Sequence, residues 1–143
     1  MTTQAQIGHG TTFQINTSVA DSPDSWVTIA EVVSVTPPSL SRDAIDATHS
    51  TSPNKWREFI PGLRDGGEVT LEVNFIPAGI GTSTILATFT SDDKVFARIN
   101  FPDSPVTTWE FQAFITAFEP DAPFDDKMSA TVTFKLSGEP DFL

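Results

Sequence analysis

The strongest constraint on the fold is an alternation of apolar and polar residues near the end of the sequence. Between residues 128 and 137 every second side chain is apolar, and those between are serine, threonine or lysine. Successive side chains of a β-strand point to opposite faces, so this period of two predicts a strand with one face buried. The apolar members, expected on the core side, are Met128, Ala130, Val132, Phe134 and Leu136.

The same period of two predicts further strands upstream. Residues 108–117 and 68–75 show it clearly, and residues 12–16, 26–35 and 95–101 show it more weakly. Phe114 interrupts the polar side of its segment, and Glu31 falls on the apolar side of its own. Clusters rich in proline, glycine and aspartate separate the segments, as is typical of turns between strands.

Residues 80–90 have a different pattern and predict one short helix, with Thr82 or Ser83 as its cap. Its apolar residues at helical spacing are Ile85, Leu86 and Phe89. Together with the strands, this helix predicts a single, mainly β domain over residues 1–143. The expected architecture is an antiparallel β-sandwich or barrel with one short flanking α-helix.

Residues 36–67 show little periodicity and are predicted to form a long loop. Passive connections are rarely this long, so the length favours a functional role. The apolar residues of the segment are Trp56, Phe59, Ile60 and Leu63, and its cations are Arg42, Lys55, Arg57 and Arg64. We expect a mobile loop that docks on an acidic surface, for which another copy of this acidic chain is the first candidate.

No residue pattern predicts catalysis or cofactor binding. The chain has no cysteine, and His9 and His49 are too far apart in sequence to indicate a metal cluster. A serine–histidine–aspartate set can be drawn from residues 46–50, but no Gly-x-Ser-x-Gly elbow accompanies it. The acidic doublets at 92–93 and 125–126 lack the ligand pattern of a calcium loop. We therefore predict no catalytic, cofactor-binding or metal-binding residue.

Charge and hydropathy limit the partners. Nineteen Asp and Glu against eight Lys and Arg give a formal net charge of −11. Such a chain disfavours the phosphate contacts that dominate nucleic-acid binding, but it is suited to line a passage along which DNA slides. Residues 1–10 lack the features of a signal peptide, and no stretch approaches the ~18 apolar residues of a membrane span. We expect folding in a cytoplasm and no membrane partner.

Residues 55–71, KWREFIPGLRDGGEVTL, resemble the central motif of the lambda-like tail tube proteins of siphophages. In that family an Arg/Glu-Phe-x-Pro-Gly-Leu segment leads into an Asp-Gly-Gly-Glu-Val turn and strand. Residues 45–50 and 122–140 also resemble family segments, upstream of the motif and at its end. The resemblance implies a β-sandwich or barrel with one flanking helix, shared with contractile-tail tubes and the type VI secretion tube.

The resemblance further implies a structural protein of the virion, not an enzyme. Six copies are expected to form a ring, and rings to stack into a hollow tube around a tape-measure protein. Tail terminator and tail-tip proteins are the other expected partners, and DNA is expected to pass through the lumen without specific binding. Assembly is expected in the cytoplasm of the bacterial host. A gene-transfer agent or a secretion-type particle would need the same subunit, so the sequence leaves these alternatives open.

Two sets of residues are assigned to assembly as hypotheses. Ring closure and ring stacking are two distinct head-to-tail contacts. Paired edge strands are the candidate for the first and the long loop for the second. The predicted inter-ring residues are Arg42, Lys55, Trp56, Arg57, Phe59, Ile60 and Arg64. The predicted lumen-facing residues, on the polar faces of the clearest strands, are Glu68, Thr70, Glu72, Glu110, Gln112, Thr131 and Thr133.

Two further classes compete with this interpretation. A β-sandwich that binds a carbohydrate or a host surface would place exposed aromatic residues, such as Trp26 or Trp56, near loop tips. A small hydrolase on a β scaffold is disfavoured because no site for it is recognisable in the sequence.

Overall fold

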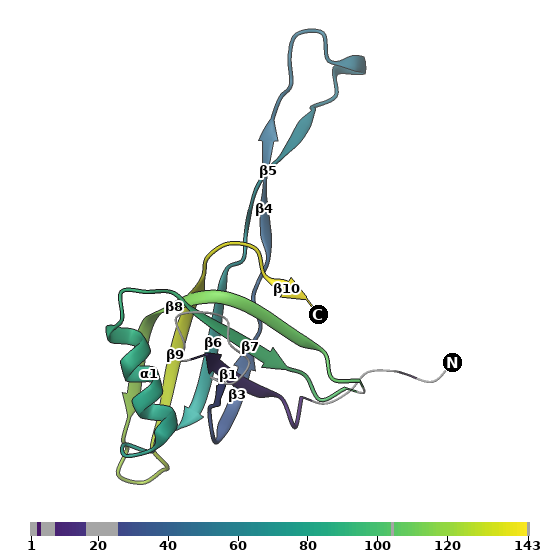
Figure 1. The fold of residues 1–143 in the computed structure, drawn as a ribbon. Coiled ribbons are helices and arrows are strands. Elements are labelled where there is room, and N and C mark those ends of the chain that lie inside the picture. Colours follow the sequence, from purple (N-terminus) through teal and green to yellow (C-terminus); the bar gives the residue numbers. More distant parts are fainter. Residues whose placement is uncertain (1–2, 4–7, 17–25, 104, 143) are drawn as a thin grey trace.

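The computed structural model describes residues 3, 8–16, 26–103 and 105–142 (Figure 1). Within them, the body is an eight-stranded antiparallel sheet and a two-stranded sheet extends away from it. The body strands are β1 (Thr12–Asn16), β2 (Trp26–Thr28), β3 (Val32–Thr36), β6 (Glu68–Asn74), β7 (Val95–Asn100), β8 (Thr108–Asp121), β9 (Ser129–Leu136) and β10 (Asp141–Phe142). The other elements are β4 (Ser41–Asp46), the 3-10 turn η2 (Pro53–Lys55), β5 (Phe59–Asp65) and helix α1 (Ile80–Thr90). The predicted mainly β fold with one flanking α-helix is confirmed.

The order of the body sheet brings its two edges together. It runs β2-β1-β7-β8-β9-β6-β3, with β10 beside β8, so β2 and β3 lie at opposite ends of the sheet. Only residues 29–31 separate these two strands along the chain. Ile29 N donates to the Phe13 carbonyl of β1 at 2.9 Å, and Asn74 N of β6 donates to the Glu31 carbonyl at 3.0 Å. This short crossing bonds to both edges and curls the sheet into a barrel-like body.

The single strand predicted for residues 26–35 is wrong, because the chain turns between β2 and β3. Glu31 has the left-handed backbone conformation, with φ of 54°, which is uncommon for a residue with a side chain. The residue that broke the apolar alternation is therefore the residue at the turn.

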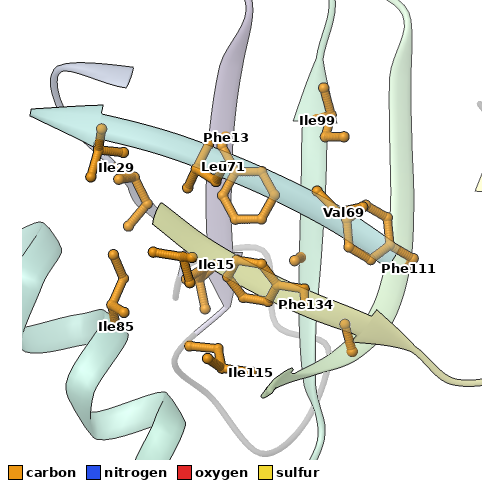
Figure 2. Close-up of a cluster of buried hydrophobic side chains, with 14 of the residues drawn as sticks. Phe13, Ile15, Ile29, Val69, Leu71, Ile85, Ile99, Phe111, Ile115 and Phe134 are labelled. Atoms are coloured by element: carbon orange, nitrogen blue, oxygen red, sulfur yellow. The ribbon is translucent and has the colours of Figure 1, made fainter. Parts of the chain in front are cut away.

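The core fills the inside of the curled sheet (Figure 2). Its side chains come from alternate strand positions and are buried, as the alternation predicts. Phe13 packs against Phe111 and Phe134, with ring centroids 6.4 and 5.1 Å away. Ile85 joins the core from α1. Met128, predicted on the core side, is instead exposed, because β9 begins one residue later and residue 128 belongs to the preceding turn.

The predicted helix is confirmed, but its predicted cap is wrong. Gly79 occupies the N-cap position, and no side chain caps the helix. Thr82 Oγ1 donates to the Ile76 carbonyl at 2.7 Å, and Ser83 Oγ donates to the Ile80 carbonyl at 2.9 Å. Both hydroxyls therefore donate hydrogen bonds to carbonyl groups and do not accept hydrogen bonds from the first N–H groups of the helix.

Residues 41–65, predicted to lie within a loop, fold into a hairpin that we call the arm. Strands β4 and β5 pair from Ser41 opposite Asp65 to Asp46 opposite Phe59, with a bulge after Arg42. The arm extends from one end of the body, and the turn between β8 and β9 lies at the other end (Figure 1). The sequence signal for a strand is one buried face. Because every residue of β4 is exposed, and every residue of β5 except Gly62, that signal is missing here.

Candidate assembly surfaces

The arm presents apolar side chains on both of its faces. Ile45 and Ile60 lie opposite each other on one face, and Phe59 lies on the other by strand alternation, while Leu63 stands at the bulge. All four are exposed, Leu63 to 84%. An isolated two-stranded hairpin is only marginally stable in water, and contiguous exposed apolar groups mark interaction sites. The arm therefore has the properties of a surface that binds another molecule.

The tip of the arm is a hydrogen-bonded turn and not the unstructured loop that the sequence predicts. The Glu58 carboxylate accepts from Ser52 Oγ at 2.6 Å and lies 3.3 Å from Nε2 of His49. Glu58 N donates to Thr48 Oγ1 at 2.9 Å, which ties the two sides of the turn together. These bonds hold the segment that carries Trp56, whose side chain is 74% exposed. The tip thus presents a large aromatic group from a pre-organised backbone.

The arm carries equal numbers of cations and carboxylates and is formally neutral. Its four cations are matched by four carboxylates, Asp43, Asp46, Glu58 and Asp65. Like charges directly opposite each other on a sheet are unfavourable, yet Arg42 and Arg64 are cross-strand partners. Arg42 Nε donates to the Gly62 carbonyl at 3.3 Å. Among the residues that the structure describes, no carboxylate forms an ion pair with either arginine.

The structure places all seven predicted inter-ring residues on the arm. Arg42, Phe59, Ile60 and Arg64 lie on its strands, and Lys55, Trp56 and Arg57 lie at its tip. All seven are exposed. Their role in contacts between rings stays a prediction.

The seven predicted lumen-facing residues lie on the outer side of the body sheet. The register places Glu68, Thr70 and Glu72 of β6 opposite Lys135, Thr133 and Thr131 of β9. Glu110 and Gln112 lie on β8, opposite Arg98 and Phe96 of β7. Each of the seven is exposed or half-buried and alternates with buried residues. Five of them are therefore side by side on β6 and β9, and the other two form a second group farther along the sheet.

Sequence reasoning missed a polar network on the outer face of β1, β7 and β8. Gln14 Oε1 accepts from Arg98 Nε and from Asn100 Nδ2, and Thr108 Oγ1 donates to Asn100 Oδ1 at 2.8 Å. The Arg98 guanidinium also lies 4.2 Å from the centre of the Trp26 ring, a cation–π contact. Trp26 is half-buried in β2, so of the two tryptophans named for the carbohydrate-binding alternative, only Trp56 is exposed near a tip. Each strand shows polar residues at alternate positions, but the pairing that joins them is not readable from the sequence.

The described residues do not gather the ligands of a metal centre. Within residues 8–16, 26–103 and 105–142, no three His, Asp or Glu side chains gather to hold a metal ion. Hydrogen bonds from Thr48 engage Asp46 and lower the pKa of its carboxyl, so Asp46 serves the backbone of the turn. No α-helix in this part of the chain is long and apolar enough to cross a membrane.

Comparison with known proteins relates the fold to tail tubes. The family model described as "Lambda phage tail tube protein, TTP" matches residues 8–143. No curated protein sequence matches the chain significantly.

Solved structures share the fold at low sequence identity. The tail of an empty gene transfer agent particle with C6 symmetry has a TM-score of 0.77 at 18% identity, over 97% of this chain and 99% of that one. The sheath/tube terminator structure of an extracellular contractile injection system has a TM-score of 0.74 at 13% identity, over 100% and 99%. The SPP1 tail tube has a TM-score of 0.70 at 10% identity, over 96% and 79%.

Proposed function

Because the chain belongs to the lambda phage tail tube protein family, we propose that its copies close into rings that stack into a hollow tube. Membership of the family makes the chain a structural subunit of a tail tube. The observation that carries the proposal is the arm, an ordered hairpin with apolar groups on both faces that extends from a body with its own core. A monomer leaves such a surface uncovered, whereas a stack of copies covers it.

The ring is proposed to hold six copies, in agreement with the C6 symmetry of the gene transfer agent tail that shares the fold. The edge strands β2 and β3 are the candidates for ring closure. Strands at an edge carry unpaired backbone groups that pair readily with another chain. Pairing of β3 in one copy with an edge of the next would also cover its exposed Val33.

The arm is proposed to make the contacts between rings. It extends beyond its own body at one end, as a contact to the next ring requires (Figure 1). Trp56 and Phe59 supply the apolar surface, and the arginines of the arm supply hydrogen-bond donors for a neighbour's carboxylates. This arrangement is head-to-tail and does not close on itself, so it continues along an axis.

The polar outer face of β6, β8 and β9 is proposed to line the lumen. Its carboxylates, such as Glu68 and Glu72, would repel phosphates, so that DNA passes without being held. The tape-measure protein is proposed to occupy this lumen during assembly in the host cytoplasm, with terminator and tail-tip proteins at the ends of the tube. A phage, a gene transfer agent and a secretion-type particle all need a subunit of this kind.

Electron microscopy of the purified protein over a concentration series, with its mass from light scattering, tests the proposal. We expect rings at low concentration and tubes at high concentration. A cryo-microscopy map of the tubes should then place Thr70, Thr131 and Thr133 at the bore. A chain that stays monomeric even with its tape-measure protein would contradict the proposed assembly, and a map with these threonines on the outer surface would contradict the lumen assignment alone.

A further inference from the structure

A groove at the root of the arm combines exposed apolar side chains with Arg42 and Arg64, which form no ion pair within the part of the chain that the structure describes. The groove has a volume of about 640 Å³ and is lined by Leu40, Leu63 and Phe142, together with Arg42 and Arg64. The three apolar side chains are exposed. The groove is therefore suited to an apolar group that arrives with carboxylates beside it, because guanidinium groups bind carboxylates through charge-assisted hydrogen bonds.

The carboxylates of the groove itself do not satisfy these arginines. Asp65 accepts a hydrogen bond from Gly67 N at 2.8 Å, and its carboxylate lies 3.3 Å from Lys135 Nζ. These interactions hold the pKa of Asp65 below its ordinary value. Glu139 also lines the groove, and among the described residues it forms no ion pair with an arginine.

The turn between β8 and β9 carries the matching chemistry at the opposite end of the molecule (Figure 1). The Phe124 side chain is fully exposed. Asp125 and Asp126 follow it directly, and both are exposed. A fully exposed phenylalanine next to two carboxylates is an unfavourable surface in isolation, but it complements an apolar groove that holds two cations.

We propose that Phe124 of one copy inserts into the groove at the arm root of the copy in the next ring, with Asp125 and Asp126 facing Arg42 and Arg64. The inference rests on the proposed stacking of rings, and it identifies the two surfaces that contact each other between one ring and the next. The two surfaces lie at opposite ends of one molecule, so they meet only between copies. The contact relieves the repulsion between the facing arginines and covers Phe124 at the same time.

Charge reversal tests the pairing, with the fraction of protein in tubes measured by sedimentation and electron microscopy. We expect D125R/D126R and R42E/R64E each to raise the concentration needed for tubes at least tenfold, while rings persist. Combining the four substitutions should bring the threshold back to within about threefold of the unmodified chain, since the charges again complement each other. Phe124→Ala should also raise the threshold without changing the unfolding temperature of the subunit.

The acidic doublet Asp92-Asp93, exposed after helix α1, provides the matched control. D92R/D93R changes the net charge as much as D125R/D126R does, and tubes should form normally. R42E/R64E combined with D92R/D93R restores the net charge but should not restore tubes. Unmodified tubes with F124A and D125R/D126R, or rescue by the control doublet, would overturn the pairing and leave the tube function intact. An unmodified chain that forms no rings would overturn both.

Discussion

Replacing Trp56 or Phe59 with alanine is predicted to weaken the stacking of rings while leaving the stability of the subunit nearly unchanged. Both side chains are exposed in the free subunit, so each change should alter the free energy of unfolding by less than ~0.5 kcal/mol. Between rings, burial of ~150 Å² of aromatic surface at ~25 cal/mol per Å² contributes at most ~4 kcal/mol. Ordering and imperfect fit reduce this, and we take ~1 kcal/mol per arm as a lower figure.

The effect multiplies because the arms of one ring act together. Six arms, the number proposed from the symmetric tail of the same fold, would lose about 6 kcal/mol at each junction between rings. That loss corresponds to about four powers of ten in the association constant of a junction. The tubes of W56A and F59A should therefore be absent at concentrations where the unmodified chain forms them, while single rings remain.

Two measurements check this prediction: unfolding in denaturant for the subunit, and sedimentation with microscopy for the tubes. Leu86→Ala is the control, because Leu86 is an exposed apolar residue of helix α1 away from the arm. A fall of more than ~2 kcal/mol in the unfolding free energy of W56A or F59A would mean that these residues support the fold itself. Tubes that form at the normal concentration would refute the assignment of the arm to the contact between rings.

Three further changes test the fold. Phe134→Ala should lower the free energy of unfolding by ~3–5 kcal/mol, measured in denaturant, because the side chain is fully buried; a loss below ~1 kcal/mol would contradict its place in the core. Gly67→Ala should lower the unfolding temperature, since φ is 74° and a Cβ would clash with the Ser39 carbonyl oxygen; an unchanged temperature would argue against this turn. Hydrogen bonds from Thr107 lower the pKa of Asp103 below its ordinary value of 3.8. Its contribution to stability is therefore present above that pH and lost as pH falls through the folded pKa. Asp103→Ala should make the decline of stability in acid shallower, as followed by unfolding at pH values below about 5, and an identical decline would contradict the assignment.

The sequence predicted the strands that bury one face and failed where no face is buried. In β6 and β9 the alternation places Val69 and Phe134 in the core, and both are buried as expected. The residues of β4 and β5 are exposed except for Gly62, so they need not alternate, and the sequence predicts a loop in place of the arm. A strand whose faces are covered only by another copy gives no periodic signal in its own sequence.

The topology was also beyond the reach of periodicity. The alternation in residues 26–35 is interrupted only at Glu31, and an interruption of one residue does not show that the chain turns there from β2 into β3. That these strands belong to opposite edges of one sheet depends on which strands they pair with. Pairing is a property of strands far apart along the chain, such as β1 with β7 and β3 with β6. Likewise, the hydrogen bond between Arg98 and Gln14 depends on the pairing of β7 with β1, which the sequence does not show.

The net charge of the chain is a poor guide to whether a tube wall holds DNA. Residues 41–65 are neutral, so the −11 charge belongs to the rest of the chain. At physiological salt a surface charge acts over only ~8 Å, so distant carboxylates do little to phosphates in the bore. What matters is whether cations on the wall are available. On the proposed lumen face Lys135 lies 3.3 Å from Asp65, and on the neighbouring strand β7 Arg98 is bound to Gln14 and stacked on Trp26. Both cations are bound within the subunit and are not free to bind phosphates. A few carboxylates and a surface of threonine hydroxyls are then enough for DNA to move along this wall without being held.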